Sequence, residues 1–477
     1  MLMLFPGERP VYPAAPSGAL RAYVALHEGA VWLTATTRIT DTDGERYAGM
    51  ARVRRSALTA PLIAERLRQR AVKQSFYRAA VRMRGGQKPV WGALSGIRPA
   101  LLLRRLMDEG SPSDAAACRR FMTLYDVSPE RAALTLDAAR AARKAEATLA
   151  SGDVCLYLGV PFCPTRCAYC SFVSQSVEKS MALIPDFVTA VQRDIRATAA
   201  AAKENGLRPV AVYFGGGTPT TLSPAQLDAV IGAMEDSFDL SALREFTVEA
   251  GRPDTITREK LETLRAHGVT RVSVNPQTMS DRVLEAIGRR HTAADVLRAL
   301  ETVRAVGGFQ VNMDLIAGLP SDDAAGFEKT LETVLSLGAE NVTVHTLALK
   351  KGARILLEGT RIPDGTEVGR MLDAAAKALR SADYSPYYLY RQKFMSGGFE
   401  NVGWCRPGTE NLYNICIMEE LCSILSMGAG ASTKLTAGDG RLERVFAPKY
   451  AKEYIDGIDA VVSGKQKITE FFRGAGK

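Results

Sequence analysis

The sequence is poor in histidine and tryptophan and has no long apolar run. Only 4 of its 477 residues are His and 3 are Trp, so few imidazoles are available as metal ligands. No run of about 18 apolar residues is present, which argues against a membrane span. The first residues, MLMLFPGERP, lack the basic flank and the apolar length of a signal peptide. We therefore expect a cytoplasmic protein without membrane association, whose 8 cysteines stay reduced or bind metal.

Acidic residues are scarce in the first third of the chain. Residues 1–150 hold 24 Lys and Arg against 13 Asp and Glu, whereas the remainder is nearly balanced. The densest part runs from Arg52 to Arg84, where only Glu65 opposes ten basic residues. Two interpretations stand: an anion-binding face for RNA or a polycarboxylate, or an Arg-rich helix surface that simply faces water. We do not expect nucleic acid to be the main partner.

Hydrophobic patterns and turn-forming residues divide the chain into three parts. Residues 1–150 predict a basic α+β domain, with strands between 18 and 55 and helices at 59–84, 99–109, 113–124 and 128–150. Residues 151–364 predict six strands separated by helices, and residues 365–477 a small α+β cap for substrate. Alternating βα units imply a parallel sheet covered by helices. Six of them favour a partial (β/α)6 TIM-like barrel, with a doubly wound open sheet as the alternative.

The C-terminal part leaves several features open. We expect a helix at 416–427. Its Tyr-rich segment, with Tyr384, Tyr387, Tyr388 and Tyr390, either packs against a flat ligand or forms a twisted edge strand. Its cysteines, Cys405, Cys416 and Cys422, are too loosely spaced to predict a second cluster. Elsewhere, Cys118 and Cys155 are expected to be structural, the latter as a small buried apolar residue.

A cysteine-rich loop follows the first strand of the βα series. In GVPFCPTRCAYCSF, the residues Cys163, Cys167 and Cys170 are spaced C-x3-C-x2-C. A structural zinc site normally has four ligands, and a catalytic thiol needs only one cysteine with a base. Iron–sulfur clusters are built on such closely spaced thiolates. Three thiolates on a four-iron cluster leave one iron open, where a substrate or cofactor can bind.

Polar residues gather at the ends of the later strands. They are the glycine turn Gly215–Thr218, then Glu249, Asn275, Gln277 and Asp314. In a barrel the chemistry lies at the C-terminal ends of the strands. Each of these residues alone is explained as a turn or a cap, but together they predict one site.

These motifs resemble the radical S-adenosylmethionine (SAM) superfamily, on the cysteine spacing and the GGGTPT turn. A finer resemblance covers most of the chain. The segments LYLGVPFCPTRCAYCSF, VYFGGGTPT, DLIAGLP, SPYYLYRQKF, ENVGW and ENLYNICIMEE, with WGALSGIRP in the basic domain, resemble the oxygen-independent coproporphyrinogen III oxidase family, most closely its HemZ branch.

The resemblance implies ligands for two cofactors. Cys163, Cys167 and Cys170 would hold a [4Fe–4S] cluster whose open iron is chelated by SAM. The positions that match the SAM pocket are Tyr157, Tyr169, Gly216, Thr218, Glu249, Gln277, Arg289, Asp314 and Ala348.

The resemblance also implies an activity, namely oxidative decarboxylation of coproporphyrinogen III propionates to vinyl groups in heme biosynthesis. A radical made by cleaving SAM would remove the hydrogen, and a low-potential donor such as flavodoxin or ferredoxin would supply electrons. The chain departs from the family twice: Phe172 replaces a further Cys of the classical oxidases, and Glu410 replaces a His of the heme chaperones. The alternatives are a heme-binding or heme-trafficking protein on the same scaffold or, suggested only by the basic front domain, a radical SAM enzyme acting on RNA.

Overall fold

The computed structural model describes residues 19–170, 175–176, 180–349, 353–392, 395–438 and 440–474. Phe172 lies outside them. The chain forms two compact units, Met1–Leu136 (unit 1) and Asp137–Lys477 (unit 2), and each has apolar clusters of its own. The three-domain division expected from the sequence stays a prediction.

Unit 1 begins with an antiparallel sheet in the order β1-β2-β3, formed by Arg21–Glu28, Trp32–Thr40 and Arg46–Arg54. Helix α1 (Pro61–Met83) packs on one face of this sheet. Gly49 permits that packing, because a Cβ there would lie 2.1 Å from the backbone oxygen of Ser75. Three further helices follow, α2 (Pro99–Asp108), α3 (Asp114–Tyr125) and α4 (Pro129–Glu146), the last of which runs into unit 2. The predicted α+β character of this part is confirmed.

Unit 2 is built on a sheet of eleven strands, in the order β12-β13-β11-β10-β9-β8-β7-β4-β14-β15-β16. Its centre holds the six predicted strands, all parallel. They are β4 (Asp153–Val160), β7 (Arg208–Gly216), β8 (Glu245–Glu249), β9 (Arg271–Ser273), β10 (Gln310–Ala317) and β11 (Asn341–Thr346). Among the described residues the two ends of the sheet do not pair with each other, so the barrel is partial and open, as expected.

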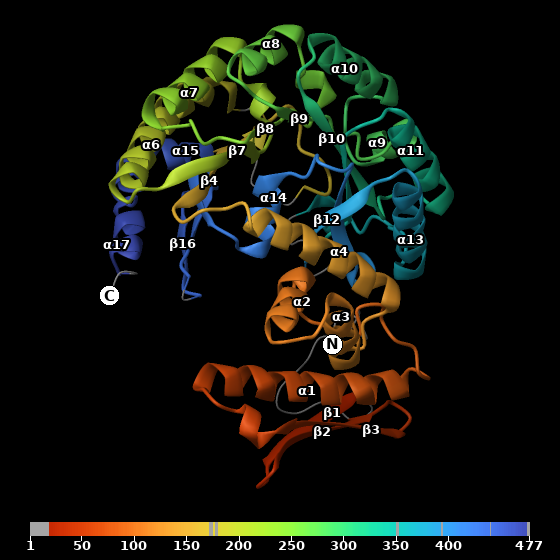
Figure 1. The fold of residues 1–477 in the computed structure, drawn as a ribbon. Helices are drawn as coiled ribbons and strands as arrows, with labels where there is room; N and C mark the ends of the chain where they lie inside the picture. The colour runs from red at the N-terminus through yellow and green to blue at the C-terminus, as the bar shows by residue number, and fades with distance from the viewer. Residues whose placement is uncertain are drawn as a thin grey trace. The chain divides into compact units, whose positions relative to one another are not determined.

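Helices cover the outer side of this sheet, and Figure 1 shows them as an arc around the strands. They are α6 (Ile184–Glu204), α7 (Pro224–Ser237), α8 (Arg258–Ala266), α9 (Asp281–Ala286), α10 (Ala293–Val306), α11 (Ala324–Ser336) and α13 (Gly365–Ser381), with the short α12 (Arg354–Leu357) before the last. A two-stranded ribbon, β5 (Phe162–Cys163) with β6 (Gln175–Ser176), follows β4. None of the described helices combines the length and apolar character that crossing a membrane requires.

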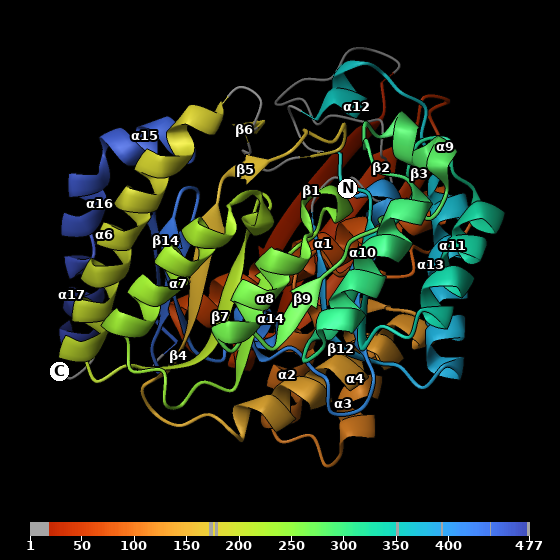
Figure 2. The ribbon, with the colours of Figure 1, turned by 90° about the horizontal axis from the view of Figure 1, so that it is seen from above.

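The C-terminal part extends the same sheet at both ends. Strands β12 (Ser385–Arg391) and β13 (Glu400–Cys405) continue it beyond β11, with β13 antiparallel to β11, and β14 (Ser423–Gly428), parallel to β4, leads to β15 (Ser432–Thr436) and β16 (Leu442–Phe446). The last helices, α15 (Ala451–Asp456), α16 (Ile458–Ser463) and α17 (Gln466–Gly474), lie against α6, as Figure 2 shows.

The helix expected at 416–427 was wrong. Helix α14 runs from Leu412 to Glu419 and ends at Glu420, which adopts the left-handed conformation (φ 58°). The segment SILSMG then forms β14, and every residue of it is buried. A continuous apolar run fits a buried strand as well as a buried helix, and only its pairing with β4 decides between them.

Candidate active site

The parallel strands bring the predicted site residues to one edge of the sheet of unit 2. The cysteine loop follows β4, and Gly216 is the last residue of β7. Glu249 is the last residue of β8, and Asp314 lies in the second half of β10. Because the carboxyl ends of parallel strands share an edge, these groups line one region of the barrel mouth.

Backbone hydrogen bonds tie the cysteine loop to the glycine turn. The amide of Gly217 donates to the carbonyl of Val160 (2.7 Å), and the amide of Thr218 donates to that of Phe162 (2.7 Å). Cys163 Sγ consequently lies 3.5 Å from Thr218 Oγ1. The two predicted motifs, separated by more than 50 residues in sequence, therefore form one structure.

The glycine turn depends on the absence of side chains. Gly216 has a φ of 102°, which an L-residue rarely adopts. A Cβ on Gly217 would lie 2.4 Å from the backbone oxygen of Phe162, and one on Gly215 would lie 3.2 Å from the Glu249 carboxyl. The turn thus presents bare backbone to the mouth of the barrel.

Two arginines surround Cys167 and Tyr169. Arg252 Nη1 donates to Cys167 Sγ (3.3 Å) and Nη2 donates to Thr165 Oγ1 (2.6 Å). Arg289 is buried, and its guanidinium donates to the carbonyl of Asn275 (2.7 Å) and to the Tyr169 hydroxyl (3.2 Å). Burial opposes ionisation of Cys167, but the charges of Arg289 and Arg252 outweigh it and lower the pKa of this thiol.

Glu249 lies at the end of a stack of tyrosine rings. Tyr213 stacks on Tyr413 with ring centroids 4.5 Å apart, Tyr157 lies 6.4 Å from Tyr213, and the Tyr213 hydroxyl donates to Glu249 Oε1 (2.6 Å). Burial raises the pKa of Glu249 to about 7, and the negative charge of Asp314 acts in the same direction. The hydrogen bond from Tyr213 opposes this rise in pKa.

Asp314 faces different partners. Asn312 Nδ2 donates to Asp314 Oδ1 (2.8 Å), and His345 Nε2 lies 3.8 Å from Asp314 Oδ2. Burial raises the pKa of Asp314, but the interactions with His345 and Asn312 outweigh it, and the net pKa is below its ordinary value. Gln277 contacts the same strand through its backbone, its amide donating to the Asp314 carbonyl (2.9 Å), and has a φ of 66°.

Not all predicted residues are in mutual contact. Hydrogen bonds join Cys163 to Thr218 and Tyr169 to Arg289, while Tyr157 reaches the Glu249 region through the tyrosine stack. Cys170 contacts Cys167 through its backbone amide (3.1 Å). Ala348, half-buried beyond β11, pairs with Met395 and shares none of these contacts.

Sequence reasoning missed four polar residues here. Arg252 follows β8 in the turn GRPDT, and Tyr213 and His345 point into the barrel from β7 and β11. His291 is buried, neither ring nitrogen has a hydrogen-bond partner among the described residues, and burial lowers its pKa to about 4. For Arg252, Tyr213 and His345 the available signal was a position near a strand end. For His291 it was the rarity of histidine, since the chain has only four.

The structure brings three other cysteines together. Cys155, Cys416 and Cys422 are buried, their sulfur atoms all lie within 4.8 Å of one another, and Cys155 Sγ is 3.6 Å from Cys422 Sγ. They lie in an apolar cluster beside Tyr413 and Ile424. Hydrogen bonding to the neighbouring thiols and burial raise the pKa of Cys155 well above its ordinary value, which fits a packed thiol. Cys405 belongs to a different cluster, so the grouping considered from sequence spacing does not form.

The tyrosines in and directly before β12 are also core residues. Tyr384, Tyr387 and Tyr388 are 2%, 2% and 5% exposed, and a Cβ on Gly403 of the next strand would lie 1.9 Å from the Tyr388 ring. β12 is the first strand of the sheet order. Tyr387 and Tyr388 therefore lie on an edge strand, as one of the two interpretations expected, but they are buried rather than half-buried, and Tyr384 directly precedes the strand.

The residues present fit an iron–sulfur cluster and a SAM molecule. The three thiols of the loop are partly exposed, and two guanidiniums favour the thiolate at Cys167, the form that binds iron. The glycine turn leaves open backbone beside Cys163, and the Nε of Arg289 is buried without a hydrogen-bond partner among the described residues. The half-buried carboxyl of Glu249 supplies an acceptor for ligand hydroxyls.

Comparison with known proteins identifies the family of the chain. The sequence profile of the Radical SAM superfamily matches residues 157–334. The chain is 34% identical over 394 residues to the oxygen-independent coproporphyrinogen-III oxidase-like protein HemZ of Bacillus subtilis, covering 80% of this chain and 77% of that protein. It is 35% identical over 198 residues to the heme chaperone HemW of the same organism, covering 41% of this chain and 50% of that protein.

A solved structure shares the fold. The coproporphyrinogen III oxidase HemN of Escherichia coli superimposes with a TM-score of 0.54 at 22% identity, over 68% of this chain and 72% of that chain. The superfamily uses a [4Fe–4S] cluster and SAM, for which the cysteine loop and the glycine turn supply suitable groups. The chain therefore belongs to the radical SAM superfamily and, within it, to the family of oxygen-independent coproporphyrinogen III oxidase-like proteins that includes HemZ.

Proposed function

We propose that this protein is a radical SAM oxidoreductase that converts propionate side chains of coproporphyrinogen III to vinyl groups. Each conversion releases CO2, one hydrogen atom, which would be taken up by the radical derived from SAM, and one further electron, which would pass to an external electron acceptor. The observation that carries the proposal is the 34% identity to HemZ over 77% of that protein, which extends well beyond the superfamily region. The geometry of the cysteine loop and its two arginines supports the same assignment.

Each part of the site has a distinct role in this proposal. Cys163, Cys167 and Cys170 hold the cluster, and the pocket for SAM is formed by Tyr157, Tyr169, Gly216, Thr218, Glu249, Gln277, Arg289, Asp314 and Ala348. When bound, the two cofactors supply one-electron chemistry and a hydrogen-abstracting radical.

Side chains and backbone groups of the chain bind, orient and shield the two cofactors. Arg252 holds Cys167 through the hydrogen bond to its sulfur and favours the thiolate. The glycine turn allows backbone amides and carbonyls to approach the ligand closely. Glu249, held by Tyr213, accepts hydrogen bonds from ribose hydroxyls. The buried Arg289 supplies a positive charge for a carboxylate. A low-potential protein such as flavodoxin or ferredoxin would supply the one electron that cleavage of SAM consumes in each conversion.

The second candidate is a heme-binding or heme-trafficking protein on the same scaffold. It is favoured by the 35% identity to HemW, which is as high as the identity to HemZ but covers only half of HemW. Such a protein would bind heme and leave a porphyrinogen unchanged.

The deciding experiment is anaerobic incubation of the reconstituted, reduced protein with SAM and coproporphyrinogen III, with products followed by mass spectrometry. We expect loss of two CO2 per tetrapyrrole, coupled to formation of 5′-deoxyadenosine. Deoxyadenosine without decarboxylation, together with stoichiometric binding of added heme, would instead favour the heme protein.

Two variants test the site assignment. Cys167→Ser should lose the cluster absorbance and most of the bound iron after reconstitution, whereas Cys118→Ser, which alters a thiol of α3, should retain both. Glu249→Ala should weaken SAM binding in a calorimetric titration while the iron content stays unchanged. Full iron content in Cys167→Ser would contradict the ligand assignment.

A further inference from the structure

The sheet of unit 1 has two faces of different chemistry. The side chains that alternate inward, such as Leu33, Ile39 and Val53, are buried beneath α1. We call the opposite side of β1, β2 and β3 the open face. Its residues are fixed by the register, in which Tyr23 lies opposite Arg38 and Trp32 lies opposite Arg54.

The open face carries positive charge and no acidic residue. Its basic residues include Arg38 on β2 and Arg46, Arg52 and Arg54 on β3, all of them exposed. None of these four arginines forms an ion pair with any residue that the structure describes. The single acidic residue of the three strands, Glu28, belongs to the other face, where it pairs with Arg68 of α1 (2.8 Å).

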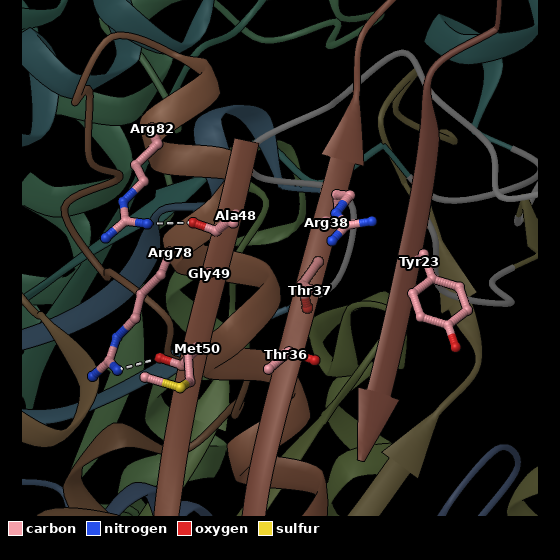
Figure 3. Close-up of a pocket in the computed structure, with 9 residues that line it drawn as sticks. All are labelled: Tyr23, Thr36, Thr37, Arg38, Ala48, Gly49, Met50, Arg78 and Arg82. Atoms are coloured by element: carbon pink, nitrogen blue, oxygen red, sulfur yellow. Dashed lines mark hydrogen bonds between the residues drawn. The ribbon is translucent and has the colours of Figure 1, made fainter. Parts of the chain in front are cut away.

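Two more arginines border the open face at the outer edge of the sheet. Arg78 and Arg82 extend from α1 and donate to the carbonyls of Met50 and Ala48 on β3, as Figure 3 shows. These bonds satisfy acceptors on an edge strand that would otherwise be open to another strand. They also keep both guanidiniums beside the hollow of about 700 Å³ that Tyr23 and Arg38 help to line.

Aromatic side chains are interleaved with these charges. Tyr23 is 71% exposed and Trp32 is 38% exposed, whereas the other two tryptophans of the chain, Trp91 and Trp404, are 0% and 2% exposed. The Arg54 guanidinium lies 5.7 Å from the centre of the Trp32 ring. Tyr23 lies opposite Arg38, six residues from Trp32 along β2, so at about 3.4 Å per residue the two rings are roughly 20 Å apart.

This combination matches one class of ligand. Proteins that bind single-stranded nucleic acid combine a positive surface for the phosphates with aromatic rings on which successive bases stack. A sheet face bearing aromatic residues is one of the standard surfaces for such binding. An acidic protein would be attracted by the charge alone and has no need for separated, exposed rings.

The threonines of the central strand favour RNA over DNA. Thr34, Thr36 and Thr40 lie on the open face between the basic and aromatic positions. Their hydroxyls both donate and accept hydrogen bonds. The 2′-hydroxyl of ribose is the group by which proteins distinguish RNA from DNA.

We propose that the open face of unit 1 binds single-stranded RNA, with Tyr23 and Trp32 stacking on bases and the arginines contacting phosphates. This site belongs to unit 1, whereas the cysteine loop belongs to unit 2, and the proposed binding does not involve the cofactors. The interpretation that the basic region merely faces water predicts the same charge but no role for the two rings.

The test is fluorescence anisotropy of the full-length protein with a labelled 12-nucleotide oligouridylate. We expect an affinity that falls steeply with salt. Four phosphate contacts give a slope of about −3 in log K against log salt, or roughly 50-fold weaker binding at 200 mM than at 50 mM KCl. Arg38→Gln should make that slope less steep by about 0.7. Arg196→Gln, an exposed arginine on α6, should leave it unchanged.

The aromatic variants separate stacking from charge. Tyr23→Ala and Trp32→Ala should each weaken binding about 5- to 160-fold, because base stacking contributes about 1–3 kcal/mol per base. Tyr450→Ala, which removes a tyrosine 47% exposed in unit 2, is the matched control. RNA should also quench tryptophan fluorescence. Trp32→Phe should abolish the quenching yet retain most of the affinity, which shows that the sheet is still folded.

Several outcomes would overturn the proposal. Absence of RNA binding at 50 mM KCl would do so. If neither alanine variant weakened RNA binding, the surface would attract RNA only by non-specific charge. Equal affinity for the oligodeoxynucleotide would remove the preference for RNA. Equal competition by polyglutamate at the same charge concentration would assign the face to an acidic protein.

Discussion

The stability of the Glu249→Gln variant, measured relative to wild type, should be greater at high pH than at low pH. Burial raises the pKa of this carboxyl from 4.5 to about 7, so the folded state holds the proton more tightly than the unfolded state does. The stabilisation from protonation is therefore fully present below pH 4.5 and is lost as pH rises through about 7. One pKa unit corresponds to 1.36 kcal/mol, so ionised Glu249 costs the folded protein about 3 kcal/mol.

The amide introduced by Glu249→Gln would keep the hydrogen bond from Tyr213 but would have no charge to bury. The free energy of unfolding of Glu249→Gln minus that of wild type should therefore grow by about 2 kcal/mol between pH 5.5 and pH 8. Urea unfolding of the cluster-free proteins measures it. Fluorescence of Trp404, the one tryptophan in the sequence of unit 2, reports on the right unit.

The matched control is Glu328→Gln, which removes an exposed carboxylate on α11. Its effect should be small at both pH values. If the difference in free energy of unfolding between Glu249→Gln and wild type stayed constant from pH 5.5 to pH 8, the reasoning would be refuted. Such a result would mean that the charged carboxylate is not desolvated in the folded state.

Three further predictions concern single side chains. Asp194→Asn should lower the free energy of unfolding by about 3–5 kcal/mol in urea, because it leaves a buried lysine without its counter-charge, and a loss below about 1 kcal/mol would contradict that view. Arg252→Met should raise the pKa of Cys167 and slow its alkylation by iodoacetamide at pH 7.5 in the cluster-free protein; an unchanged rate would show that the guanidinium does not control this thiol. Gly216→Ala should cost about 1–2 kcal/mol of stability, because φ is 102° and a Cβ would lie 3.0 Å from a backbone oxygen. Gly232→Ala, at a helical position with open space around it, should be neutral or stabilising, and equal effects in the two variants would contradict the strain argument.

The six central strands and the helices between them follow from local pattern. Each strand is a short apolar run and each helix has its own start signal, such as the capping boxes at Ser223 and Thr292. Such signals act over a few residues, so one sequence is enough to find them. The run after Cys422 has no such signal, because a fully buried strand and a buried helix look alike, and the prediction there was wrong.

The candidate site divides in the same way. The cysteine loop, the glycine turn and the polar residues at strand ends were found because spacing and strand position are written in the sequence. The hydrogen bond from Arg252 to Cys167 and the tyrosine stack beside Glu249 were not, since their partners come from different strands. No local pattern states which side chains of two strands will face each other.

The sequence by itself determined the order of βα units, the cysteine spacing and the concentration of basic residues near the N-terminus. These are local or compositional properties, and they were sufficient to predict the fold class and the radical SAM family. The tertiary structure alone decided which charges and thiols meet. It placed Asp194 of α6 against Lys465 near the C-terminus (2.6 Å), brought Cys155 to Cys416 and Cys422, and set the arginines of two strands on one face of a sheet. Such contacts depend on packing between elements that are far apart in the chain. Strand register and burial determine this packing only when the whole unit folds.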